Sequence, residues 1–143
     1  MHYIFRPNIP GELGDNTEGD FTKRPIITNH LHFVFDYFPD DIFTSCEVII
    51  VVENLLNKIL DNNLTGLSTP KLIEYELNQQ YFVWENSDDI PNKNYFMMEV
   101  CGNVSDDFYL TKEFNLIISE KALELLKLFR ISFAKWEEFK GLN

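Results

Sequence analysis

Apolar and polar residues alternate between Ile27 and Phe38. One side of this pattern carries Ile27, Leu31, Phe33, Phe35 and Tyr37, and the other side carries Thr28, His30, His32 and Asp36. Successive side chains of a β-strand point to opposite faces, whereas a helix repeats every 3 to 4 residues. The pattern therefore predicts a half-buried strand.

A helical repeat follows this strand. Thr44-x-x-Glu47 fits a capping box. In this motif the threonine oxygen accepts a hydrogen bond from the backbone N–H of residue 47, and the Glu47 carboxylate accepts one from the backbone N–H of residue 44. Apolar residues then recur at helical spacing, at Val48, Val52, Leu55, Leu56 and Ile59. The β-branched run Val48 to Val52 favours a strand instead, but the closely spaced Leu and Ile residues from 55 to 60 favour a helix. The sequence predicts a helix over about 45–61, ended by Asn62-Asn63 and Gly66.

The remaining chain predicts further strands and one more helix. Short apolar segments bounded by turn residues predict strands at Tyr95–Val100 and Phe114–Ile118. Ser119 is a good N-cap for a helix over about 120–129. Residues 70–83 predict one or two strands with Leu72, Tyr75, Leu77, Tyr81 and Val83 as buried candidates, and 131–139 alternates as a closing strand would.

These elements predict one α+β domain over residues 1–143. Its mainly antiparallel sheet packs with two principal helices, about 45–61 and 120–129, in a single layer on one face. The glycines and acidic residues of 10–20 predict a flexible surface loop. Cys46 and Cys101 are expected to be reduced, buried thiols, because neither belongs to a CxxC pair.

Charge is distributed unevenly along the chain. Residues 1–110 carry 18 Asp and Glu against 6 Lys and Arg, a net of −12, whereas residues 111–143 carry 5 against 6, a net of +1. An acidic surface disfavours nucleic acid and anionic membranes and favours basic partners. The start of the chain has no secretory signal and the longest aliphatic run is Val48 to Val52, so we expect a cytoplasmic protein without a membrane span.

Three aspartate pairs lie in predicted connections and are the candidate partner-binding residues. They are Asp40 and Asp41, Asp88 and Asp89, and Asp106 and Asp107. The nearby aromatic residues Trp84, Tyr95, Phe108 and Tyr109 are candidate anchors, because aromatic side chains carry much of the energy of interfaces. In the alternative interpretation the aspartates keep the connections solvated and the aromatic residues belong to the core.

His30 and His32 are the candidate catalytic or metal-binding residues. His30 and His32 share one strand face and are adequate zinc or iron ligands, but Asp36 is about 20 Å from His30 along an extended strand. The sequence shows no further ligand, no nucleophile motif and no cofactor motif. A small metal-dependent hydrolase that uses His30 and His32 stays an alternative, as does a general protein-interaction module.

Three segments together resemble a known family. They are the helix end Leu60-Asp61-Asn62-Asn63-Leu64-Thr65-Gly66-Leu67, Cys101-Gly102 followed by Asp106-Asp107-Phe108-Tyr109-Leu110, and Leu116 to Lys127, whose sequence LIISEKALELLK is similar to the segment LVVSERALELLK of that family. The family comprises small bacterial immunity proteins of polymorphic and contact-dependent toxin systems. The resemblance implies a protein without catalytic residues or cofactor that binds a co-encoded toxin and covers its active site or an essential surface.

Overall fold

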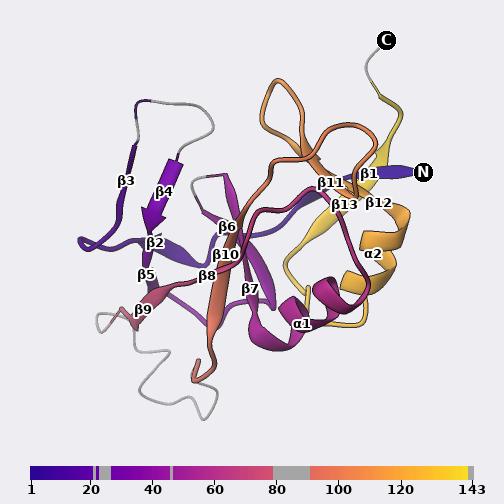
Figure 1. Ribbon diagram of the computed structural model, residues 1–143. Helices are drawn as coiled ribbons and strands as arrows, with labels where there is room; N and C mark the ends of the chain where they lie inside the picture. Colours follow the sequence, from indigo (N-terminus) through magenta and orange to yellow (C-terminus); the bar gives the residue numbers. More distant parts are fainter. Residues whose placement is uncertain (21, 23–26, 46, 79–90, 142–143) are drawn as a thin grey trace.

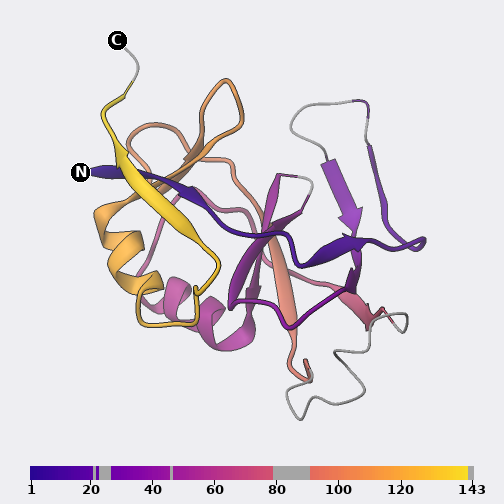
Figure 2. The same ribbon diagram turned by 180° about the vertical axis from the view of Figure 1, so that it is seen from behind.

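The computed structural model describes residues 1–20, 22, 27–45, 47–78 and 91–141. Figures 1 and 2 show the chain from two opposite sides. The strands before the first helix are β1 (His2–Arg6), β2 (Gly11–Leu13), β3 (Glu18–Asp20), β4 (Ile27–His30), β5 (His32–Phe35), β6 (Ile42–Ser45) and β7 (Val48–Val52). They are followed by α1 (Glu53–Asp61), β8 (Lys71–Leu72), β9 (Glu74–Leu77), β10 (Tyr95–Glu99), β11 (Phe108–Leu110), β12 (Leu116–Ser119), α2 (Glu120–Leu126) and β13 (Lys135–Phe139).

The described strands form four small sheets. Their strand orders are β11-β12-β1-β13, β6-β7-β10-β8, β2-β5-β9 and β3-β4. All of these pairs are antiparallel except β5 with β9. The two helices contact each other and lie on the side of the molecule away from β2, β5 and β9 (Figure 1). The predicted α+β class with a mainly antiparallel sheet and two principal helices is confirmed.

The first helix begins eight residues later than the sequence predicts, because Val48–Val52 forms strand β7. All five of its residues are buried, as in a strand covered on both faces, and β-branched side chains suit such a strand. The predicted capping box is wrong, since Thr44 lies in β6 and Glu47 lies in the turn between β6 and β7 with φ 66°. Helix α1 instead follows Val52, which makes no side-chain cap.

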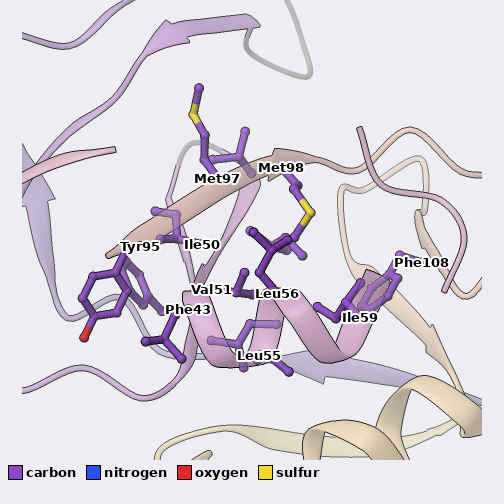
Figure 3. Close-up of a cluster of buried hydrophobic side chains, with 14 of the residues drawn as sticks. Phe43, Ile50, Val51, Leu55, Leu56, Ile59, Tyr95, Met97, Met98 and Phe108 are labelled. Carbon is purple, nitrogen blue, oxygen red and sulfur yellow. The ribbon is translucent and has the colours of Figure 1, made fainter. Parts of the chain in front are cut away.

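The core forms where α1 packs on β7 and β10. Leu55, Leu56 and Ile59 are the buried residues of α1, as their spacing predicts. Figure 3 shows them beside Val51 of β7 and Met98 of β10. Asn62 caps the helix, and Asn63 and Gly66 adopt positive φ, as predicted from the residues that end it.

The second helix begins where the sequence predicts. The Ser119 side chain accepts a hydrogen bond from the backbone N–H of Ala122 at 3.0 Å, and Glu120 lies in the first turn. The helix ends at Leu126 rather than near residue 129. Residues 127 and 128 form a turn, residue 129 lies in a bend, and β13 follows from Lys135.

Several predicted segments differ from the structure. The expected loop at 10–20 contains β2 and β3, whose backbones pair with β5 and β4. The expected strand at 27–38 is interrupted at Leu31, so that β4 and β5 belong to different sheets. Leu72 is 57% exposed rather than buried, and Cys101 is also exposed. Tyr81, Val83 and Cys46 lie outside the described residues.

Candidate functional site

The structure describes four of the six aspartates predicted to bind a partner. Trp84, Asp88 and Asp89 lie outside the described residues, so their role stays a prediction.

Asp40 and Asp41 hold the segment after α2 in place. Asp40 is buried, and its Oδ2 accepts a hydrogen bond from the backbone N–H of Phe133 at 2.8 Å, while the Arg130 Nε lies 3.7 Å from Oδ1. Asp41 Oδ2 accepts from the backbone N–H of Arg130 at 2.8 Å. Burial raises the pKa of Asp40 above its ordinary value, against the opposing effects of backbone hydrogen bonds and Arg130. Asp40 is thus a core carboxyl group rather than a surface charge.

We expect Asp40→Asn to leave the free energy of unfolding at neutral pH unchanged or to raise it by up to about 1 kcal/mol. The amide oxygen still accepts the hydrogen bond from the Phe133 N–H, and the substitution removes the buried charge. Because the folded pKa of Asp40 is raised, the folded state holds a proton that the unfolded state has released, so this contribution to stability declines as pH rises through that window. Urea unfolding across the acidic range checks this. Asp41→Asn is the control, and parallel pH profiles of the native and Asp40→Asn proteins contradict the argument.

Asp106 and Asp107 also make bonds within the chain. Asp107 Oδ2 accepts from the backbone N–H of Thr65 at 2.9 Å, and Oδ1 accepts from the Ser119 hydroxyl at 2.6 Å. Asp106 Oδ2 accepts from the backbone N–H of Asn103 at 2.8 Å within a turn. Asp107 therefore joins the loop after α1 to the N-cap of α2.

The predicted aromatic anchors in the described chain are core residues. Phe108 and Tyr95 belong to the hydrophobic core, and Tyr109 is buried. Their burial matches the alternative interpretation of these residues, so in this structure Asp40, Phe108 and Tyr109 do not form the surface that the sequence predicts.

A different acidic surface lies on the outer face of the β2-β5-β9 sheet. The inner face carries Phe33 and Phe35, which are fully buried. On the outer face, Val34 of β5 is opposite both Glu12 of β2 and Glu76 of β9, and His32 of β5 is opposite Glu74 of β9. The three glutamates are exposed. We call Glu12, Glu74 and Glu76 the acidic sheet face.

His32 lies beneath this face in a fixed orientation. Its side chain is 7% exposed, and its Nδ1 accepts a hydrogen bond from the backbone N–H of Asn16 at 3.2 Å. Its backbone N–H donates to the Thr17 hydroxyl oxygen at 3.1 Å, and the Thr17 hydroxyl donates to its backbone carbonyl at 2.9 Å. A Cβ on Gly14 would come within 2.1 Å of Nδ1, so the imidazole ring needs glycine there.

The other ring nitrogen of His32 points toward two carboxylates. Nε2 lies 3.9 Å from Glu74 Oε2 and 3.8 Å from Glu76 Oε2, and it is buried without a hydrogen-bond partner. Because Nδ1 is an acceptor, the proton of the neutral ring resides on Nε2. A metal ion on Nε2 would require this proton to leave or to move to Nδ1, where it would face the backbone N–H of Asn16.

Glu74 connects the two histidines. His30 Nε2 lies 2.9 Å from Glu74 Oε1, and the Asn16 side-chain amide donates to Glu74 Oε2 at 2.9 Å. The hydrogen bond with His30, and to a smaller extent the one from Asn16, lower the pKa of Glu74 below its ordinary value. Glu74 therefore keeps its negative charge in mildly acidic solution.

The acidic sheet face depends on residues that sequence reasoning missed. Glu74-x-Glu76 alternates with Tyr75 and Leu77 inside a predicted strand, which is a usable signal for an acidic outer face. Asp36, which extended-strand geometry places too far from His30 to complete a metal site, accepts a hydrogen bond from the Asn78 side chain at 2.9 Å.

In comparisons with protein-family models, with curated proteins and with solved structures, the chain has no significant match. Among the described residues, no helix is both long and apolar enough to cross a bilayer.

Proposed function

We propose that this protein is a non-catalytic immunity protein that binds and neutralises a basic, co-encoded bacterial toxin in the cytoplasm. The acidic sheet face is the observation that carries this proposal. Its three exposed glutamates come from two strands that flank β5, so a folded sheet holds them as a fixed array of negative charge. Such an array attracts a basic surface and speeds its association.

The aspartates contribute to this function in a different way from the one the sequence predicts. Asp41, Asp106 and Asp107 are partly exposed and add to the negative field, although each also bonds within the chain. The resemblance of residues 116–127 to immunity proteins is consistent with a binding role and supplies the class of partner.

A metal-dependent hydrolase is less well supported by the geometry. No group of three or more His, Cys, Asp or Glu residues in the described part of the chain has an arrangement suited to a metal ion. The hydrogen bond from Asn16 to His32 Nδ1 also places the proton of the neutral ring on the nitrogen that faces Glu74 and Glu76.

We expect the double variant Glu12→Lys and Glu76→Lys to slow association with the protein encoded by the neighbouring toxin gene about tenfold at low ionic strength. Both glutamates are exposed, and the closest contact of Glu76 given for the described residues is with His32 Nε2 at 3.8 Å, so the variant mainly tests charge. The difference should shrink at high salt, because screening suppresses steering. Stopped-flow or surface-based kinetics at two salt concentrations measure it.

The matched control is Glu113→Lys with Glu138→Lys, which changes the net charge equally at exposed positions outside the β2-β5-β9 sheet. Its association rate should change less. Equal slowing by both double variants indicates an effect of net charge alone, and an unchanged rate in the Glu12→Lys, Glu76→Lys protein rejects the acidic sheet face as the docking surface.

A further inference from the structure

We propose that a cavity between the two four-stranded sheets binds a small free amine, an ammonium group on an aromatic or branched hydrocarbon body. The cavity has a volume of about 320 Å³ and lies between the end of β1, the β6–β7 turn and the β11–β12 hairpin. Pockets for small molecules begin at about 300 Å³, so this cavity has room for a ligand of modest size. Its described lining shares no residue with the acidic sheet face, and the inference does not rest on the proposed function.

The floor of the cavity is apolar. Phe5 of β1, Ile49 of β7 and Leu116 of β12 line it, and their exposed fractions are 1%, 1% and 6%. Phe5 and Leu116 belong to one sheet and Ile49 belongs to the other, so the cavity opens into the core between the sheets. A floor of this kind favours a hydrocarbon group, because binding removes apolar surface from water.

The charges on the lining favour a cation. Arg6 and Glu47 are the charged residues of the described lining, and the Arg6 guanidinium forms an ion pair at 3.1 Å with Glu137, which lies beyond it. Glu47 Oε2 is shielded from solvent, and electrostatic attraction is stronger where water is excluded. Because a carboxylate has about four acceptor positions, it can accept a ligand N–H in addition to bonds within the chain.

Two turns place a strained residue at this cavity. Glu47 has φ 66° and Phe114 has φ 64°, in the left-handed region where glycine or asparagine is the usual choice. Phe114 lies in a closed turn, since its N–H donates to the Thr111 carbonyl at 2.9 Å. Strained residues of this kind cluster at binding sites, where the side chain itself is needed. A carboxylate and an aromatic ring thus occupy turn positions that the backbone alone would assign to glycine.

Phenethylammonium is the probe for this site, and 2-phenylethanol and 3-phenylpropionate are its neutral and anionic analogues. Nuclear magnetic resonance titration of the full chain at about pH 7, where the amine is charged, measures the dissociation constant and the location of each compound. We expect phenethylammonium to bind with a dissociation constant of about 1 mM or less and to shift the backbone amides of Ser45, Glu47, Ile49 and Asn115. It should bind about fivefold to tenfold more tightly than 2-phenylethanol, and 3-phenylpropionate should bind most weakly.

The same titrations can overturn the inference. Binding of the alcohol or of the carboxylate as tight as that of phenethylammonium contradicts a cationic ligand. Amide shifts confined to residues outside the cavity contradict the site, and the absence of binding by all three compounds at about 10 mM contradicts both.

A lysine side chain of another protein carries the same ammonium and hydrocarbon chemistry. Nα-Acetyl-lysine N-methylamide is the probe for this source. We expect it to bind more weakly than phenethylammonium, because Phe5 and Phe114 favour an aromatic body. The reverse order overturns the assignment to a free amine and assigns the cavity to a lysine of a partner protein.

Glu47→Gln tests the carboxylate. Glutamine keeps the size of the side chain, so the variant should lose the preference for phenethylammonium over 2-phenylethanol and keep its affinity for the alcohol. Glu113→Gln is the matched control, because Glu113 is an exposed glutamate of the β11–β12 turn outside the described lining, and it should retain the preference. An equal loss of preference in both variants overturns the role of Glu47. The comparison of the probes on the native protein remains decisive if Glu47→Gln does not fold.

Discussion

Leu55→Ala should lower the free energy of unfolding by about 2 to 5 kcal/mol, the range for truncating a buried leucine. Leu55 is fully buried in α1, where the helix packs on β7 and β10. The substitution removes apolar contacts and leaves a cavity that the surrounding strands cannot fill without moving. Urea denaturation monitored by tryptophan fluorescence and circular dichroism measures the loss.

Leu60→Ala is the matched control for this variant. Leu60 belongs to the same helix but is 54% exposed, so its replacement should change stability by no more than about 0.5 kcal/mol. Both changes convert leucine to alanine in one helix, and helix propensity therefore cancels in the comparison. Equal effects of the two substitutions would contradict the buried face assigned to α1.

Asp107→Ala should have the second large effect, a loss of about 2 to 4 kcal/mol in the free energy of unfolding. The carboxylate accepts from the Thr65 backbone and the Ser119 hydroxyl at 2.9 Å and 2.6 Å. Ser119 in turn caps α2. Removing one side chain thus leaves a backbone donor without its partner and loosens the cap of a helix at the same time.

Asp106→Ala is the neighbouring control. Asp106 accepts one bond from the Asn103 backbone within an exposed turn, so we expect a loss of about 1 kcal/mol. Thermal and urea unfolding of both variants give the comparison. If Asp107→Ala costs no more than Asp106→Ala, the link between α1 and α2 contributes little, and Asp107 becomes available for the partner-binding role that the sequence predicts.

Local chemistry made part of the fold predictable. The Ser119 cap, the Leu55, Leu56 and Ile59 stripe, and the helix-ending Asn63 each depend on residues within one or two turns of one another. The start of α1 was not predictable in this way, because Val48–Val52 is apolar throughout. A fully buried strand and a buried helical segment give the same apolar run, and only pairing with β6 and β10 decides between them.

The candidate site depended on contacts that spacing does not show. Adjacent aspartates such as Asp106 and Asp107 look alike in sequence, yet Asp107 joins the loop after α1 to the N-cap of α2, and Asp106 closes a turn. The acidic sheet face was missed for the converse reason. Glu12 and Glu76 become neighbours of Val34 only after three distant segments pair in the correct register.

The parallel pairing of β5 with β9 has a consequence for the order of folding. The chain between these strands, residues 36–73, includes β6, β7 and α1, so the pair closes a long loop, whereas the β6–β7 hairpin closes a short one. Closing so long a loop costs more conformational entropy than closing a hairpin, so we expect this pair of strands to form late in folding. A partner that bridges β2 and β9 therefore acts as a clamp, and hydrogen exchange of their amides should slow more on binding than that of β7 or α1.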